Sequence, residues 1–145
     1  MFQFRLQPVL DYRKQIEDRV MSEFADIKRR LAEEVALLER MQHERAALLD
    51  HLLEMGKHRM RSADIAAYCA YIRHIKDKEA MQVQSIAAIE SELSEKRTVL
   101  VDAVKNRKVI EIIKENKFQE HKLHMSAQER KELDELAILR SSRGE

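Results

Sequence analysis

Residues 20–55, VMSEFADIKRRLAEEVALLERMQHERAALLDHLLEM, decide the fold of this chain. Alternating steps of four and three residues run through this stretch and touch eleven positions, nine of which are apolar. These positions are Val20, Phe24, Ile27, Leu31, Glu34, Leu38, Met41, Arg45, Leu48, Leu52 and Met55. Such spacing puts the apolar side chains on one stripe of a helix and is typical of a coiled-coil seam. We therefore expect a first helix over about residues 5–56, with Pro8 in its first turn, where a missing N–H costs nothing.

The composition of the 145 residues favours helix and argues against a globular enzyme. Ala, Glu, Leu, Lys and Arg supply 75 residues, whereas the chain has two glycines, one proline and no tryptophan. This share is typical of a long helix or a coiled coil. The 27 basic and 26 acidic side chains nearly cancel, so we expect no nucleic-acid partner. The longest apolar run, residues 65–72, is far shorter than the roughly 20 residues that span a bilayer, so we expect no membrane insertion.

A helix stop signal and a helix start signal lie close together near the middle of the chain. Gly56 follows the last seam position, and we expect it to adopt the left-handed conformation that ends many helices. Ser62 is expected to cap a second helix over about residues 63–140. A turn as short as residues 57–62 makes the two helices antiparallel neighbours. The prediction is an all-α fold: a long antiparallel two-helix coiled coil, or helical hairpin, in which residues 1–145 form a single unit.

The second helix continues the seam spacing. Its positions are Ile65, Tyr68, Ile72, Ile75, Glu79, Gln82, Ile86, Ile89, Leu93, Lys96 and Leu100. If Met55 faces Ile65, the numbers of facing residues add to about 120. Some 50 paired residues then make a rod on the order of 75 Å long. Residues 115–145 are expected either to overhang or to fold back. They either continue the helix or start a separate short helix at Ser126.

Polar side chains interrupt the seam, and we expect them to weaken the pair while fixing its register. They are Glu34, Arg45, Glu79, Gln82 and Lys96. On the helix surfaces, Asp26 with Arg30 and Glu92 with Lys96 have the spacing of ion pairs within one helix.

The side chains that could carry chemistry are few. His121 and His124 supply only two of the three or four ligands that zinc takes from a protein, so we expect no metal, no cofactor and no catalytic residue. Cys69 is expected to be a buried or half-buried filler. The basic run 105–108 is expected to be a solvated face near Glu17, with docking on an acidic partner as the alternative.

Two tyrosines follow the expected turn. Because Tyr68 and Tyr71 are three residues apart, a two-helix pair cannot bury both rings fully. We expect Tyr68 to pack in the seam and Tyr71 to stay exposed beside Ile75, as an aromatic anchor for another protein.

Several motifs, in order along the chain, resemble the flagellar FliJ protein family. Residues 2–14, FQFRLQPVLDYRK, are similar to its Phe-x-Phe-x-Leu-x-x-Val-Leu opening. Further similarity occurs at residues 68–72, YCAYI, at 103–111, AVKNRKVIE, and at 133–135, LDE. Together the motifs extend over nearly the whole chain.

The resemblance implies a non-enzymatic stalk of the bacterial flagellar type III export apparatus, in the cytoplasm at the inner face of the cell membrane. Such a stalk enters the pore of a hexameric export ATPase, contacts the cytoplasmic domain of the membrane export gate and escorts export chaperones. The residues that would bind the ATPase ring here are Phe2, Phe4, Arg5, Leu133, Asp134 and Glu135. Those that would bind the export gate are Tyr68, Tyr71 and Ile75. His43 and Ala47 stand where relatives have aromatic residues, so half of the gate surface departs from the family pattern.

Two other functions fit the same pattern. One is the related stalk of an injectisome, and the other is a purely structural coiled-coil spacer that self-associates. We expect the stalk to be a monomer, whereas a spacer would form stable dimers or filaments. An enzymatic function would rest on His121 and His124.

Overall fold

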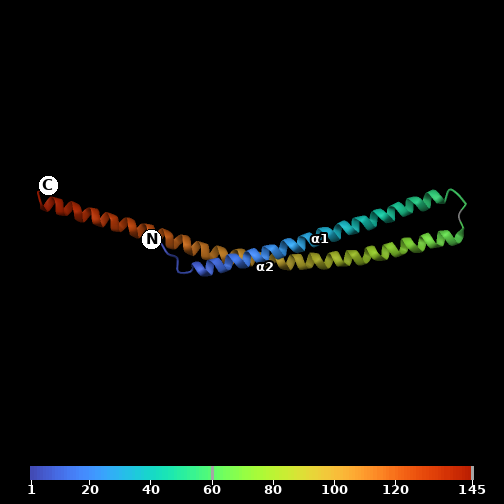
Figure 1. Cartoon of the computed structure of the whole chain (residues 1–145), viewed down its shortest axis with the longest axis horizontal. Coiled ribbons are helices and arrows are strands. Elements are labelled where there is room, and N and C mark those ends of the chain that lie inside the picture. The colour runs from blue at the N-terminus through green and yellow to red at the C-terminus, as the bar shows by residue number, and fades with distance from the viewer. Residues whose placement is uncertain (60, 145) are drawn as a thin grey trace. The chain divides into compact units, whose positions relative to one another are not determined.

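The computed structural model describes residues 1–59 and 61–144. These residues form two helices and no strand: α1 (Gln7–Met55) and α2 (Ser62–Ser142) (Figure 1). The predicted all-α hairpin is confirmed. The chain divides into two units, one of Val20–Leu100 and one of Met1–Arg19 with the chain from Val101 onward. The expectation that the whole chain behaves as a single unit stays a prediction.

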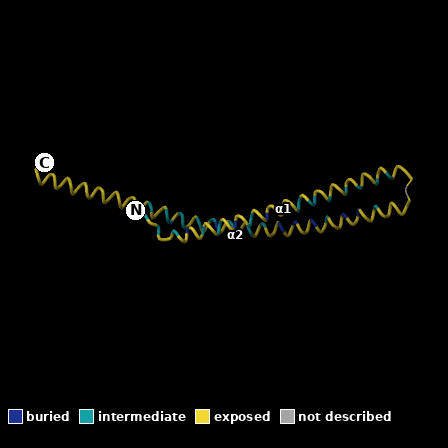
Figure 2. Tube along the Cα trace, viewed as in Figure 1, coloured by how far each residue is buried: buried dark blue, intermediate teal, exposed yellow. Residues whose placement is uncertain are grey.

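The unit of Val20–Leu100 contains the whole predicted seam. All eleven seam positions of α1 are buried or half-buried, as are ten of the eleven in α2. The exception is Ile65, which is 42% exposed beside the turn. Isoleucines supply most of the buried core, which comprises Val20, Ile27, Ile72, Ile75, Ile86 and Ile89 (Figure 2). Two helices bury only a narrow stripe of each other, so the residues beside this stripe remain in solvent.

The register of the two helices agrees with the predicted one in both units. In the cross-helix pairs the two residue numbers add to about 120, from 115 for Tyr71 with Glu44 to 124 for Arg45 with Glu79. In the other unit, the rings of Phe2 and Phe118 face each other. The residue numbers of facing positions therefore add to about 120 within each unit.

Two expected ion pairs within single helices are wrong. Arg30 reaches across to Glu92, with 3.3 Å between Nη1 and Oε1, and Lys96 pairs with Glu23 at 2.7 Å. Asp26 instead lies 3.6 Å from Arg29. Arg30 and Lys96 are long side chains close enough to the facing helix to find a carboxylate there. Charged side chains therefore form ion pairs between the two helices as well as within one helix.

The helix ends differ from expectation at two residues. Gly144, with a φ of 75°, is the one described residue in the left-handed region, so the prediction for Gly56 is wrong. The Gly56 N–H instead bonds to the carbonyl of Leu52 at 2.9 Å, which prolongs the helical hydrogen-bond pattern past Met55. At the start of α2, the carbonyl of Arg61 accepts the N–H of Ile65, so Arg61 holds the capping position and Ser62 is the first helical residue. The expected turn, residues 57–62, also includes Met60, which lies outside the described residues.

In the unit of Met1–Arg19 with the chain from Val101 onward, Leu10 is the most deeply buried side chain at 1% exposed. Ala103 is buried in α2 of the same unit. Beyond His121 every described residue of α2 is exposed, yet the helix runs unbroken to Ser142. We call residues 122–142 the C-terminal extension; it continues the helix and does not start a new one at Ser126 (Figure 2). Among the described residues, neither helix has a stretch long and apolar enough to span a bilayer.

Candidate functional site

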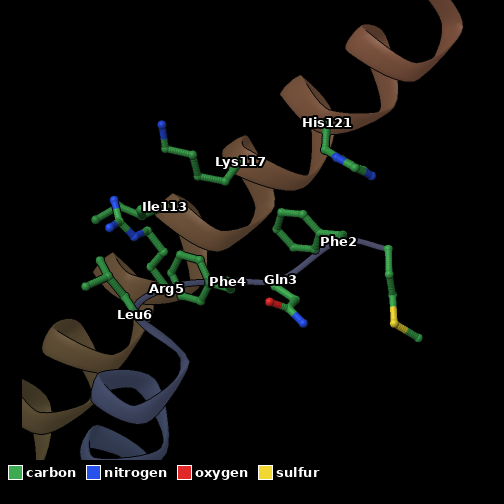
Figure 3. A pocket seen from close by; sticks show the side chains of 9 residues that line it. Phe2, Gln3, Phe4, Arg5, Leu6, Ile113, Lys117 and His121 are labelled. Carbon is green, nitrogen blue, oxygen red and sulfur yellow. The ribbon is translucent and has the colours of Figure 1, made fainter. Parts of the chain in front are cut away.

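Residues Met1–Leu6, which we call the strap, precede α1 and lie along α2 (Figure 3). The Gln7 N–H bonds to the carbonyl of Phe4 at 3.1 Å, and the Leu10 N–H bonds to the carbonyl of Leu6 at 2.9 Å. Leu6 therefore caps α1, which begins two residues later than the sequence suggested. Pro8 falls in the first turn, as expected.

The ring of Phe2 anchors the strap to α2. Its centroid lies 5.3 Å from that of Phe118 in an edge-to-face arrangement and 5.5 Å from the His121 ring. The ammonium of Lys122 lies 4.8 Å from the centroid of the Phe118 ring, which adds a cation–π contact. The register pairs position 2 with position 118, so the sequence carried the signal for this contact, although the sequence analysis did not identify Phe118 as a functional residue.

An open hollow of about 750 Å³ lies between the strap and α2. Met1, Phe2, Gln3, Phe4, Arg5, Leu6, Ile113, Lys117 and His121 line it (Figure 3). The three expected ATPase-binding residues Phe2, Phe4 and Arg5 are therefore together at one place. Its lining combines the aromatic residues Phe2 and Phe4 with the cationic residues Arg5 and Lys117, which suits an apolar side chain that lies beside a carboxylate.

The other three expected ATPase-binding residues lie elsewhere in this unit. Leu133, Asp134 and Glu135 are all exposed on the C-terminal extension, and the Leu133 side chain is 65% exposed. At 1.5 Å per helical residue, about 22 Å of α2 separates Phe118 from Leu133. The structure therefore does not bring the two sets of residues into one site.

The three expected gate-binding residues differ in their exposure. Tyr68 is half-buried and packs edge-to-face on His51, with 6.0 Å between the ring centroids. Tyr71 is 48% exposed and its hydroxyl donates to a carboxylate oxygen of Glu44 at 3.2 Å. Ile75 is only 5% exposed, so its side chain belongs to the seam. The surface that a partner can reach is thus the one around Tyr71, and Glu44 is a member of it that the sequence analysis did not identify.

The polar seam residues bind across the helix pair. Arg45 Nε donates to Glu79 Oε1 at 2.9 Å, and the Glu79 side chain is only 13% exposed. The Gln82 amide donates both to the backbone carbonyl of Glu34, at 2.9 Å, and to its carboxylate. These four polar seam residues therefore each have a partner on the other helix, and their hydrogen bonds fix the register of the two helices.

Arg107 performs the same function in the unit that holds the strap. Its Nε donates to Glu17, and its Nη1 donates to Glu111 Oε2 at 2.6 Å. The hydrogen bonds to Glu17 and then Glu111 raise the pKa of the Arg107 guanidinium, so this group is charged throughout the neutral pH range. The expectation that Glu17 lies beside the basic run 105–108 is confirmed. Lys105 and Lys108 are exposed on the surface of α2.

The remaining candidates for chemistry do not converge. The His121 ring packs on Phe2, whereas His124 is exposed. Within residues 1–59 and 61–144, no three His, Cys, Asp or Glu side chains gather where they could hold a metal ion. Cys69 is exposed, so the expectation of a buried or half-buried filler is wrong. It is adjacent to the seam position Tyr68, and the narrow stripe between two helices does not extend to it.

Comparisons with known proteins agree with this architecture. The sequence pattern of the family described as flagellar FliJ protein matches residues 2–145. No curated protein matches the chain. Among solved structures, CT670 from Chlamydia trachomatis, described as a YscO homologue, is similar with a TM-score of 0.65 and 25% sequence identity. The similarity covers 96% of this chain and 94% of that one. Since the family pattern extends over the strap and both helices, the chain belongs to the flagellar FliJ protein family.

Proposed function

We propose that this chain is a non-enzymatic stalk and adaptor of the bacterial flagellar type III export apparatus. The observation that carries the proposal is the match to the FliJ family over residues 2–145. The helix pair adds physical support, because it exposes side chains along its outer faces and so offers contacts to more than one partner. In this function the chain supplies binding and positioning, and its partner performs ATP hydrolysis.

One set of contacts is with the ring of a hexameric export ATPase. Phe2, Phe4 and Arg5 offer aromatic and cationic groups at the strap, and Leu133 with its acidic neighbours offers a second surface on the C-terminal extension. Because about 22 Å of helix separates Phe118 from Leu133, the two sets meet the ring at different depths of its pore.

A second set of contacts is with the cytoplasmic domain of the membrane export gate. Tyr71 is its exposed anchor, whereas Tyr68 and Ile75 hold the helix beneath it in place. An exposed tyrosine with a hydrogen-bonded hydroxyl is a favoured residue at protein interfaces. Export chaperones are further partners of the same stalk, and the complex is located in the cytoplasm at the inner face of the cell membrane.

The test is to add the purified chain to its cognate export ATPase and to measure hexamer formation and ATP turnover. We expect both to increase, and the substitution Leu133→Ala should weaken the increase. Leu123→Ala is the matched control, because Leu123 is also exposed on the C-terminal extension but lies outside the proposed contacts. If saturating amounts of the unmodified chain change neither quantity, the proposal is wrong.

A second candidate is the equivalent stalk of an injectisome, favoured by the structural similarity to CT670, described as a YscO homologue. The same assay with a flagellar and an injectisome ATPase distinguishes the two functions by which ring responds. A self-associating spacer is tested by mass in solution, where the stalk predicts the monomer mass of 17.1 kDa.

A further inference from the structure

The strap is held to α2 by few contacts. Its backbone carbonyls at Phe4 and Leu6 accept hydrogen bonds from Gln7 and Leu10, and both of these donors belong to α1. Met1, Gln3, Arg5 and Leu6 are exposed, so docking depends chiefly on the half-buried rings of Phe2 and Phe4. Such a segment has a docked state and an undocked state that differ by only a small number of contacts.

In the docked state, α2 already contacts the Phe2 ring, which is one of the groups proposed to bind the ATPase. Phe2 lies against Phe118 and His121, and its ring also forms a wall of the open hollow. The hollow gives a partner access to part of this ring, but a partner that encloses the whole Phe2 side chain must take it away from α2. When only the undocked fraction of a protein can bind, the apparent affinity falls in proportion to that fraction.

We propose that the strap is an autoinhibitory latch, in which docking of Phe2 on Phe118 and His121 withholds this ring from the ATPase. This proposal rests on the proposed function, since the ATPase ring is the partner for which the two states compete. Lys122, positioned on the Phe118 ring, helps to hold Phe118 in the orientation that receives Phe2. Weakening the contact of Phe2 with Phe118 and His121 raises the undocked fraction of the strap. The chain then binds the ATPase more tightly.

The first experiment measures docking in the free protein. The chain has no tryptophan, so Phe2→Trp introduces a single indole whose emission depends on its exposure to water. In this background, Phe118→Ala and His121→Ala should each move the emission toward that of a fully exposed indole. Leu123→Ala is the matched control, because Leu123 is exposed on the next turn of α2, and it should leave the emission unchanged. Circular dichroism checks that all variants keep their helices.

The second experiment measures the affinity of otherwise unmodified chains for the cognate hexameric ATPase. An edge-to-face aromatic pair contributes about 0.5–1.5 kcal/mol, so Phe118→Ala should tighten binding by about 2- to 12-fold. Phe2→Ala removes the latch together with the group that it withholds, and it should weaken binding.

The two experiments fail in different ways. If Phe118→Ala and His121→Ala leave the indole emission unchanged, the strap does not dock and the latch is refuted. If the emission shifts but the affinity for the ATPase stays constant or falls, docking withholds nothing and the latch is refuted as well. If the unmodified chain does not bind the ATPase, the proposed function fails, and the emission alone decides whether the strap docks.

Discussion

The burial of Leu10 supports a prediction about the stability of the unit that holds the strap. Leu10→Ala removes three carbons from the most completely buried side chain of the described residues. At about 0.8 kcal/mol per buried carbon, the lost transfer free energy is about 2.4 kcal/mol. The cavity term is small here, because two helices surrounded by water can close a gap or admit solvent. We therefore expect this unit to lose about 2–3 kcal/mol of free energy of unfolding.

Hydrogen exchange measures this loss where it occurs. A loss of 2–3 kcal/mol corresponds to about 30- to 150-fold less protection of the amides of residues 7–19 and 101–114. The amides of residues 65–93, in the other unit, should be nearly unaffected. Leu133→Ala is the matched substitution at an exposed site and should change protection less than twofold. If Leu10→Ala and Leu133→Ala have equal effects, the assignment of Leu10 to the core is wrong.

Three further predictions follow from the other contacts. A double-mutant cycle on Arg45 and Glu79 should give a coupling of about 1–1.5 kcal/mol in urea unfolding, because their ion pair is largely shielded from water. Tyr71→Phe should change the free energy of unfolding by less than about 0.5 kcal/mol, yet it should weaken binding of the gate domain. Ile75→Ala, at a buried position, should lower the free energy of unfolding by about 2–3 kcal/mol in the same urea measurement. Deleting residues 123–145 should leave the unfolding of Val20–Leu100 unchanged within about 0.5 kcal/mol while reducing ATPase binding in a pull-down.

The first two of these predictions have a control variant. For the ion pair it is the exposed pair Arg30 and Glu92, whose coupling should stay below about 0.5 kcal/mol; equal couplings would contradict the argument from burial. For Tyr71 it is Tyr12→Phe, since Tyr12 is exposed on α1 and should leave gate binding intact. A deletion that destabilises Val20–Leu100 would show that the C-terminal extension supports the helix pair.

The seam and its register could be predicted from the sequence because both follow from simple geometry. Alternating steps of three and four keep a stripe facing one neighbour, and a short turn leaves little freedom in the offset. Polar residues such as Arg45 and Gln82 were correctly placed in this stripe, although it is apolar elsewhere. The family was likewise identified from short motifs in the right order, and the match over residues 2–145 confirms it.

The wrong predictions concern choices that depend on the neighbouring helix or on the local backbone. Spacing along α1 offers Asp26 as a partner for Arg30, whereas the observed partner, Glu92, depends on the position of the facing helix. Gly56 permits a left-handed conformation but does not require it, so the residues of the turn determine the outcome. The apolar neighbours of Cys69 favour burial, whereas its exposure depends on the width of the stripe that two helices can cover.

The partner-binding residues were only partly accessible to sequence reasoning. The register already paired Phe2 with Phe118, but it could not show that the chain before Gln7 leaves the helix and follows α2. The bond from Tyr71 to Glu44 depends on side-chain conformations that residue spacing does not specify.

The C-terminal extension has a consequence for how it would engage a partner. Helix formation is slow and unfavourable at its first turn, whereas each later residue adds a hydrogen bond to an existing end. Residues 122–142 are all exposed, but they extend a part of α2 that already packs on α1. A protein that closes around Leu133 therefore meets a preformed helical surface, and its binding free energy is not spent on initiating that helix.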